Sequence, residues 1–293
     1  MYCAKLSIAA ACLLSCLCSL GPVSSLGAQV WQSPPKVLPG TQPLTWDDPL
    51  DVRLMDGAHR YIERKIAAAP AGRLQHWKRD PSSPAAYGES VSANRTRFRT
   101  LIGAVNRGAE LNHNIGLPAL PLPVQMERIG DDQCPALLVE TALYRISRVR
   151  WPVLKGVFGE GLLLEPKGAA RAHVVAVPDA DQLPEQLAGL VPGLPAERQV
   201  ARRLAENGVR VVVPVLISRA PVLEGNVQQT RREWIYRQAF HTGRHIIGYE
   251  VEKIQAAIDW LESTAGDEPT IGVAGYGEGG LLAFYTAAID TRV

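Results

Sequence analysis

The sequence predicts a mixed α/β fold in which a mostly parallel sheet follows a helical segment. After Met126, short runs rich in Val, Ile and Leu replace the helical patterns of the first half of the chain. The runs 143–151 and 157–164 are joined by a stretch that begins with Pro and ends with Gly, which is typical of an antiparallel hairpin. Further apolar runs alternate with helical patterns, as the strands of a parallel sheet do. These runs are 173–177, 209–217 and 270–274.

The helices between these runs are predicted from apolar spacing and from residues that end helices. Residues 196–207 are expected to form a helix that stops at Gly208. A long helical region is expected over 231–263 and a last helix over 281–289. The run 209–217 is nearly unbroken in Val, Pro, Leu and Ile, so we expect a central strand that is covered on both faces.

Two more helices are expected before the sheet. The Asp-Pro pair at 48–49 resembles an N-cap followed by proline at the first helical position, and Pro70 with Gly72 is expected to end this helix. A second helix is predicted to begin at the Ser-Pro pair at 83–84. Its apolar face is expected to consist of Tyr87, Val91, Phe98, Leu101, Ile102 and Val105.

The N-terminus has the pattern of a secretory signal peptide. Residues 1–5 carry a positive charge, 6–20 are almost wholly apolar, and the small residues Ser25, Gly27 and Ala28 offer a cleavage site. The apolar run is shorter than the ~20 residues that a membrane span needs. We therefore predict an exported protein, periplasmic or secreted, with no stable membrane span after cleavage. An uncleaved anchor and a lipoprotein attached at Cys16 are the alternatives.

The predicted domain organisation has three parts. Residues 1–28 form the signal peptide, 29–125 a linker and N-terminal helical region, and 126–293 the first part of an incomplete α/β domain. The runs after the hairpin supply only a few parallel strands, and so small an open sheet would leave a hydrophobic edge bare. We therefore expect the chain to be a truncated product or a fragment.

Composition and charge exclude several function classes. The chain has 293 residues, 46% of them hydrophobic, and a formal net charge of +2. This charge does not indicate a nucleic acid or an anionic membrane as partner, and no basic patch is interleaved with aromatic residues. After the predicted cleavage Cys134 is the one remaining cysteine, and we expect it to be a buried small side chain.

No metal site is expected. His241 and His245 have the i, i+4 spacing that places two zinc ligands on one helical face. Thr242 stands where the zinc-protease motif requires Glu, and no third ligand is evident in the sequence. We therefore expect these histidines to have packing or surface roles.

The most informative segment is the turn after the last predicted strand, where residues 271–282 read IGVAGYGEGGLL. A strand that enters a helix through such a turn is typical of the nucleophile elbow, G-x-S-x-G. Because that turn is sharp, the residues two before and two after the nucleophile must be small. Only a register centred on Gly277 meets this requirement, with Gly275 and Gly279 as flanks and Gly280 next to them. Glycine has no hydroxyl, thiol or carboxylate that could attack a carbonyl.

An oxyanion hole is expected beside this turn. In the elbow geometry it is made by the backbone N–H after the nucleophile and by one from the loop after an earlier strand. By position the candidates are Glu278, Asp179 and Ala180, the last two on the loop 178–181. Such a pocket can bind a carbonyl or a carboxylate without a nucleophile. The alternative is that this loop is only a strand-to-helix turn, since Pro and Asp are common there.

The same glycines permit a second interpretation. Gly275, Gly277 and Gly280 match the dinucleotide-binding fingerprint G-x-G-x-x-G. That motif normally opens the first βα unit and is followed by an acidic residue about 20 positions later. Here two strand–helix units precede the motif, so a Rossmann-type dinucleotide-binding protein is kept as an alternative. The main interpretation requires no cofactor.

Three stretches of the chain resemble a known family. They are RLQHWKRDPSSPAAYGESVSANRTRFRTLIGAV (73–105), FHTGRHIIGYEVEKIQAAIDWLE (240–262) and IGVAGYGEGGLLAFYTAAID (271–290). They are similar to large secreted α/β-hydrolase-like proteins of planctomycete-type bacteria, of the dienelactone hydrolase or acetyl-xylan esterase kind. The resemblance implies a partial α/β-hydrolase-type, mostly parallel sheet with an N-terminal helical segment. It also implies Ser at the elbow of active members, with an acid and a His on later strands, so Gly277 departs from the family pattern.

These observations together predict an exported esterase-like scaffold without a working nucleophile. Its ligand would be an ester or a carbohydrate-derived molecule, and no nucleic acid is expected as partner. The alternative is an active carboxylic-ester hydrolase that uses residues outside the usual positions or beyond Val293.

Overall fold

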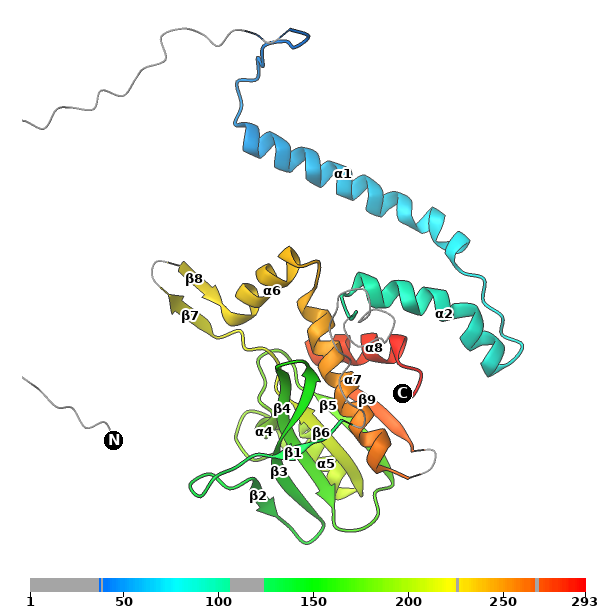
Figure 1. The fold of residues 1–293 in the computed structure, drawn as a ribbon, viewed down its shortest axis with the longest axis vertical. Helices are drawn as coiled ribbons and strands as arrows, with labels where there is room; N and C mark the ends of the chain where they lie inside the picture. Colours follow the sequence, from blue (N-terminus) through cyan, green and yellow to red (C-terminus); the bar gives the residue numbers. More distant parts are fainter. Residues whose placement is uncertain (1–36, 38, 106–123, 225–226, 267–268) are drawn as a thin grey trace, which may run out of the picture. The chain divides into compact units, whose positions relative to one another are not determined.

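The computed structural model describes residues 37, 39–105, 124–224, 227–266 and 269–293 (Figure 1). The chain divides into two units, Met1–Ala67 and Ala68–Val293. The predicted signal peptide, 1–28, lies outside the described residues. Within the described ranges, no helix is both long and apolar enough to cross a lipid bilayer.

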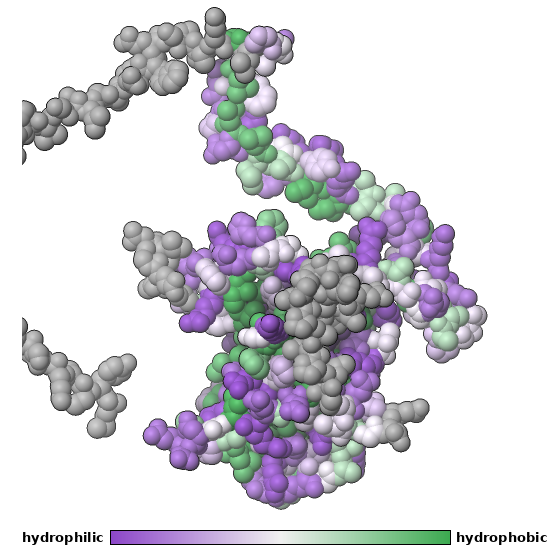
Figure 2. Space-filling model, viewed as in Figure 1, coloured by the Kyte–Doolittle hydropathy of each residue, from purple (hydrophilic) through white to green (hydrophobic). Residues whose placement is uncertain are grey.

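Helix α1, Leu50–Arg73, begins in the first unit and crosses the boundary between the units. The predicted start is confirmed, since the N–H of Arg53 donates to the carbonyl oxygen of Pro49 at 3.1 Å. None of the residues of α1 is buried, and Figure 2 shows hydrophobic and hydrophilic residues side by side along it. The predicted stop at Pro70 is wrong, because the helix includes Pro70. Proline lacks an N–H donor and its ring crowds the carbonyl four residues earlier, but the residues that follow Pro70 keep their own N–H groups and continue the helix to Arg73.

The second unit begins with a short helical turn, η1 (Leu74–His76), and helix α2 (Pro84–Leu101). The predicted start of α2 is confirmed: the Ser83 side chain accepts a hydrogen bond from the N–H of Ala86 at 3.1 Å. Ile102 is buried as expected, but Leu101 is 70% exposed. Helix α2 ends at Leu101 and Ile102 is its C-cap, so the regular helical spacing on which the prediction relied stops between these two residues.

A seven-stranded mixed sheet forms the centre of the second unit, in the order β1-β3-β4-β6-β5-β9, with β2 paired to β3. Strands β3 and β4 form the predicted antiparallel hairpin, and β4 also pairs antiparallel with β6. Strands β6, β5 and β9 run parallel. The strands are β1 (Glu127–Arg128), β2 (Leu137–Glu140), β3 (Tyr144–Leu154), β4 (Val157–Pro166), β5 (Ala172–Val177), β6 (Val209–Pro214) and β9 (Ile271–Gly275).

Helices cover both faces of this sheet (Figure 1). On one face, Leu163, Val175 and Val212 pack in a core with the buried side chains of α7 and α8. On the other face, Leu162 and Val211 pack with α4 and α5. Because successive strand residues point to opposite faces, near-continuous apolar strands fill both cores. The helices are α4 (Pro184–Leu187), η2 (Ala196–Arg198), α5 (Val200–Glu206), α6 (Arg231–His241), α7 (Ile246–Thr264) and α8 (Glu278–Ile289). The predicted α/β fold class is confirmed.

The long helix predicted over 231–263 is wrong in one respect, since it consists of the two helices α6 and α7. The chain turns between them at Gly243, which has φ 66°. His245 then caps α7, and its Nδ1 accepts a hydrogen bond from the N–H of Ile247 at 3.1 Å. His241 and His245 therefore lie on different elements and do not share a helical face.

Two further features differ from the prediction. Cys134, expected to be buried, is exposed. It closes a turn in which its N–H donates to Oδ1 of Asp131 at 2.7 Å, and this turn precedes β2 at the surface. A small antiparallel hairpin, β7 (Pro221–Glu224) and β8 (Val227–Thr230), stands between β6 and α6 and was not predicted. Its strands are four residues long, too short for a clear alternation of apolar and polar residues.

Candidate functional site

The carboxyl ends of β5 and β9 meet where the chain leaves neighbouring parallel strands toward opposite faces of the sheet. The two strands pair up to Val177 and Gly275. After β5 the chain passes to α4 and α5 on one face, and after β9 it enters α8 on the other. In open α/β sheets ligands bind at such a switch point. The structure therefore brings the loop 178–181 together with the turn 276–277.

Gly277 has the backbone conformation of a sharp strand-to-helix turn. Strand β9 ends at Gly275 and α8 begins at Glu278, so the chain passes from strand to helix across only two residues. Gly277 is the N-cap of α8, with φ 58° and ψ −125°. A side chain is strained in this region of backbone conformation, whereas glycine adopts it freely.

The two flanks of Gly277 approach the backbone too closely for any side chain. A Cβ built on Gly275 would lie 2.3 Å from the carbonyl oxygen of Gly279, and one on Gly279 would lie 2.3 Å from that of Val177. Gly280 is less crowded, with 3.3 Å from its built Cβ to the carbonyl oxygen of Gly275. The sequence GYGEG thus allows β9 to turn into α8 against the end of β5.

Two backbone N–H groups from different elements converge on one oxygen atom beside Gly277. The N–H of Glu278, at the start of α8, donates to Oδ1 of Asp179 at 2.8 Å. The N–H of Ala180, on the loop after β5, donates to the same oxygen at 2.8 Å. These donors occupy the positions expected for an oxyanion hole. The N–H of Asp179 itself donates to the Gln182 side chain, so Asp179 supplies the bound oxygen and not a donor.

The carboxylate of Asp179 also fills the space in which a nucleophile side chain would lie. A Cβ built on Gly277 would be 2.4 Å from Cγ, Oδ1 and Oδ2 of Asp179. The negative charge lies at the N-terminus of α8, where the helix dipole favours it. The sequence placed Asp179 in this loop, but the direction of its side chain depends on the pairing of β5 with β9.

A network of charged side chains lies next to this hole and includes the side chain of Glu278. Arg219 and Arg232 both pair with the Glu278 carboxylate, which is only 10% exposed. Arg232 also lies 3.7 Å from Oε1 of the buried Glu250, and Lys253 Nζ lies 2.5 Å from Oε2 of Glu250. The network therefore contains three cationic side chains and two carboxylates. Sequence reasoning missed it, because Arg219 and Arg232 are 59 and 46 residues from Glu278.

His245 lies close enough to Arg232 of this network to feel its charge. Burial lowers the pKa of His245, and the positive charge of Arg232 lowers it further. A neutral ring agrees with its Nδ1 acting as a hydrogen-bond acceptor at the start of α7. In the part of the chain that the structure describes, no group of three His, Cys, Asp or Glu residues is placed to hold a metal ion.

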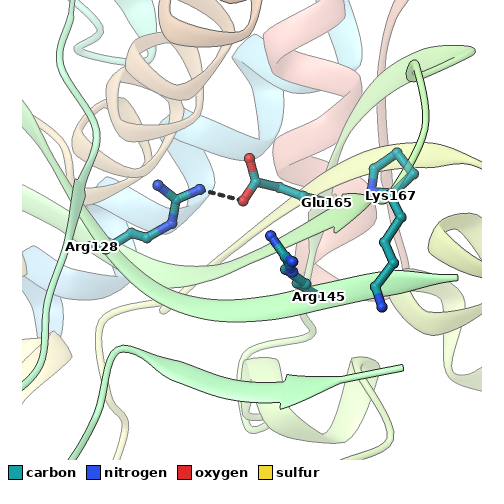
Figure 3. Close-up of a pocket in the computed structure, with 5 residues that line it drawn as sticks. Arg128, Arg145, Glu165 and Lys167 are labelled. Atoms are coloured by element: carbon teal, nitrogen blue, oxygen red, sulfur yellow. Dashed lines mark hydrogen bonds and ion pairs between the residues drawn. The ribbon is translucent and has the colours of Figure 1, made fainter. Parts of the chain in front are cut away.

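A pocket of about 350 Å³ lies at the other end of the sheet (Figure 3). Glu165 and Pro166, which line this pocket, are the last residues of β4, and this end of β4 pairs with the first half of β6. The pocket therefore lies toward the amino ends of the parallel strands. Its cations pair with acidic neighbours: Arg128 with Glu165 at 2.5 Å, and Lys167 with Glu140 at 3.0 Å. The exposed fractions of these side chains range from 23% for Glu165 to 57% for Arg128, and the pocket contains none of the residues of the elbow.

Residues 160–293 match the model of the dienelactone hydrolase family. The matched region runs from β4 to the end of the chain and includes β5, the loop 178–181, β9 and the elbow. Together with the sheet and its flanking helices, this match shows a fold of the α/β-hydrolase type. Within the matched region Gly275 ends β9, Gly277 is the N-cap of α8 and Gly280 lies in the first turn of α8, after two earlier strand–helix units.

Similar solved structures include two acetyl xylan esterases and a third protein to which this activity has been assigned. A protein assigned as one from Bacteroides fragilis has 15% identity, a TM-score of 0.49, and coverage of 78% of this chain and 58% of its own. The enzyme from Paenibacillus sp. R4 has 17% identity, a TM-score of 0.41, and coverage of 75% and 61%. Acetyl xylan esterase 1 from Thermoanaerobacterium sp. has 13% identity, a TM-score of 0.40, and coverage of 68% and 60%. The chain thus spans about three fifths of the length of these proteins. No curated protein sequence matches it.

Proposed function

We propose that this chain is an exported, ligand-binding form of an esterase scaffold in which the elbow binds an oxygen of the ligand and performs no nucleophilic attack. One observation carries this proposal. Gly277 occupies the elbow, and the carboxylate of Asp179 accepts hydrogen bonds from both N–H groups of the hole.

The chemistry of the elbow supports binding without a covalent step. An acyl transfer through this turn requires a nucleophilic atom on the residue at its apex. Glycine supplies none, and a side chain there would overlap with Asp179. The two converging N–H groups need no nucleophile to function, because they stabilise any oxygen that carries negative charge.

The ligand that fits this hole is a carboxylate or an ester carbonyl. Two N–H donors at 2.8 Å from a single oxygen match the acceptor geometry of either group. The family match supports an ester or its acid product as the ligand class. We extend this proposal to esters derived from carbohydrates. The proposed export rests on the signal-peptide pattern of residues 1–28.

The test is covalent labelling and turnover by the full chain. A serine-directed fluorophosphonate probe, read out by intact mass, and p-nitrophenyl acetate hydrolysis are measured in parallel. We expect no mass increase and no hydrolysis above the buffer rate. Stoichiometric labelling together with turnover would overturn the proposal in favour of an active carboxylic-ester hydrolase that uses other residues. The Gly277→Ala variant is the matched control, because hydrolysis that survives this change does not arise at the elbow.

A further inference from the structure

Asp179 fills the hole with a group that resembles a small ligand. Its side chain beyond the backbone is a CH2 joined to a carboxylate, and acetate is a CH3 joined to a carboxylate. We propose that Asp179 is an internal competitor of the hole, and that a free monocarboxylate of the acetate type displaces it. This inference rests on the proposed function and adds the ligand class and the residue that regulates access.

The donors of the hole come from two elements that the sheet holds in place. The N–H of Glu278 is fixed by the start of α8, and the N–H of Ala180 by the loop that leaves β5. The pairing of Val177 with Gly275 sets the distance between these elements. The donors therefore stay in position whether or not the Asp179 side chain is present, and removal of the Asp179 side chain leaves two preformed donors for another oxygen atom.

The surrounding charge favours an anion in this place. The network beside the hole contains Arg219, Arg232 and Lys253 against the carboxylates of Glu250 and Glu278. Arg232 and Lys253 have side chains only 13% and 11% exposed, so water screens their charges weakly. The one-charge excess of cations in this network favours a carboxylate over a neutral ester carbonyl.

Asp179 can leave without a change in the fold. Asp179 is partly exposed, which places the hole at the surface of the molecule. Rotation about the side-chain bonds of Asp179 withdraws its carboxylate from both N–H groups. Because the competitor is covalently attached, its effective concentration is high, and a free carboxylate binds weakly until Asp179 is removed.

The test is a titration of the full chain with sodium acetate, followed by the backbone amide signals of Glu278 and Ala180 in ¹⁵N-labelled protein. Sodium chloride at equal ionic strength controls for general anion effects. Three variants are compared with the unmodified chain. They are Asp179→Ala, Asp179→Asn and Asp181→Ala, the last as a matched control on the same loop.

We expect acetate to bind Asp179→Ala at least tenfold more tightly than the unmodified chain, with both amide proton signals moving downfield on binding. Asp179→Asn should lie between the two, because its amide oxygen can still accept both hydrogen bonds but carries no charge. Asp181→Ala should equal the unmodified chain.

Any other order of affinities overturns the proposal, as does an effect of chloride equal to that of acetate. Thermal unfolding of each variant identifies misfolding, and Asp179→Asn retains the shape of the side chain if Asp179→Ala does not fold. Failure here is separate from failure of the proposed function, which would show as probe labelling and turnover.

Discussion

The built Cβ position of Gly277 lies 2.4 Å from the carboxylate of Asp179, so the two residues compete for the same space. Gly277 provides the turn, and Asp179 uses the space that the missing side chain leaves free. The contact joins the carboxyl ends of β5 and β9 and fills the hole between them.

This relationship predicts a measurable coupling between positions 277 and 179. Gly277→Ala should lower the free energy of unfolding by about 1–3 kcal/mol, because of strained backbone and contact with Asp179. In the Asp179→Ala background the same change should cost less, with a coupling energy of about 0.5–3 kcal/mol. Urea unfolding of the four chains measures this cycle.

Gly156→Ala is the matched control for the coupling. Gly156 also has positive φ, at 75°, but nothing lies within 4 Å of its built Cβ. Its substitution should therefore cost the same with and without Asp179. Equal costs of Gly277→Ala in both backgrounds would show that Asp179 does not occupy the space beside it.

Glu278→Gln should destabilise the fold by about 3 kcal/mol, because it leaves the buried guanidinium of Arg232 without its full counter-charge. Glu140→Gln is the exposed counterpart, since Glu140 is 41% exposed and also has two cationic partners. Its cost should stay below about 1 kcal/mol. Chemical denaturation at low and at 0.5 M salt compares the two. Equal costs would contradict the buried character of the network.

Trp151→Phe tests the contact between the sheet and α7. Trp151 is fully buried, and its Nε1–H donates to the carbonyl oxygen of Lys253 at 3.1 Å. The substitution removes this hydrogen bond and leaves a cavity where the larger indole ring packed, so we expect a loss of about 1–3 kcal/mol in urea unfolding. Trp77→Phe, at a position 42% exposed, should change stability by less than about 0.5 kcal/mol. A Trp151→Phe substitution that leaves the free energy of unfolding unchanged would refute this contact between the sheet and α7.

The lowered pKa of His245 predicts that the free energy of unfolding depends on pH. Its pKa is lowered in the folded chain, first by burial and then by Arg232. The unfolded chain therefore binds more protons as pH falls below about 6.5, and stability falls with it. The contribution of His245 to the free energy of unfolding is complete above about pH 6.5, and it is lost as the pH falls toward the pKa of His245 in the folded chain.

His245→Asn should flatten the decline in stability between about pH 6.5 and 5, because Asn also caps helices but does not titrate in this range. Some slope should remain, since burial and then the charge of Arg210 also lower the pKa of His173. Urea midpoints across this pH range measure the effect, with His76→Asn at an exposed position as control. An unchanged slope in His245→Asn would contradict a lowered pKa of His245 in the folded chain.

The strands and the elbow were predictable because their signals are local. Val209–Pro214 is a run of apolar residues, and the spacing of Gly275, Gly277 and Gly279 identifies the turn in a single register. The start of α2 was predictable for the same reason, since Ser83 and Pro84 are adjacent to the helix that they begin.

The remaining features depend on contacts between distant parts of the chain. The break between α6 and α7 relies on one glycine, Gly243, inside an otherwise helical pattern. The orientation of Asp179 depends on the register of β5 against β9, which brings residues 99 positions apart into contact. The ion pairs of Glu278 with Arg219 and Arg232 depend on the path of the chain after β6, which composition and spacing do not indicate.

A crystal structure of the full chain, grown without carboxylate buffers, tests the central claim most directly. The account predicts that Oδ1 of Asp179 lies within hydrogen-bond distance of the backbone nitrogens of both Glu278 and Ala180, beside Gly277 with positive φ. An Asp179 side chain turned away from the elbow, with water bound to both N–H groups, would contradict it.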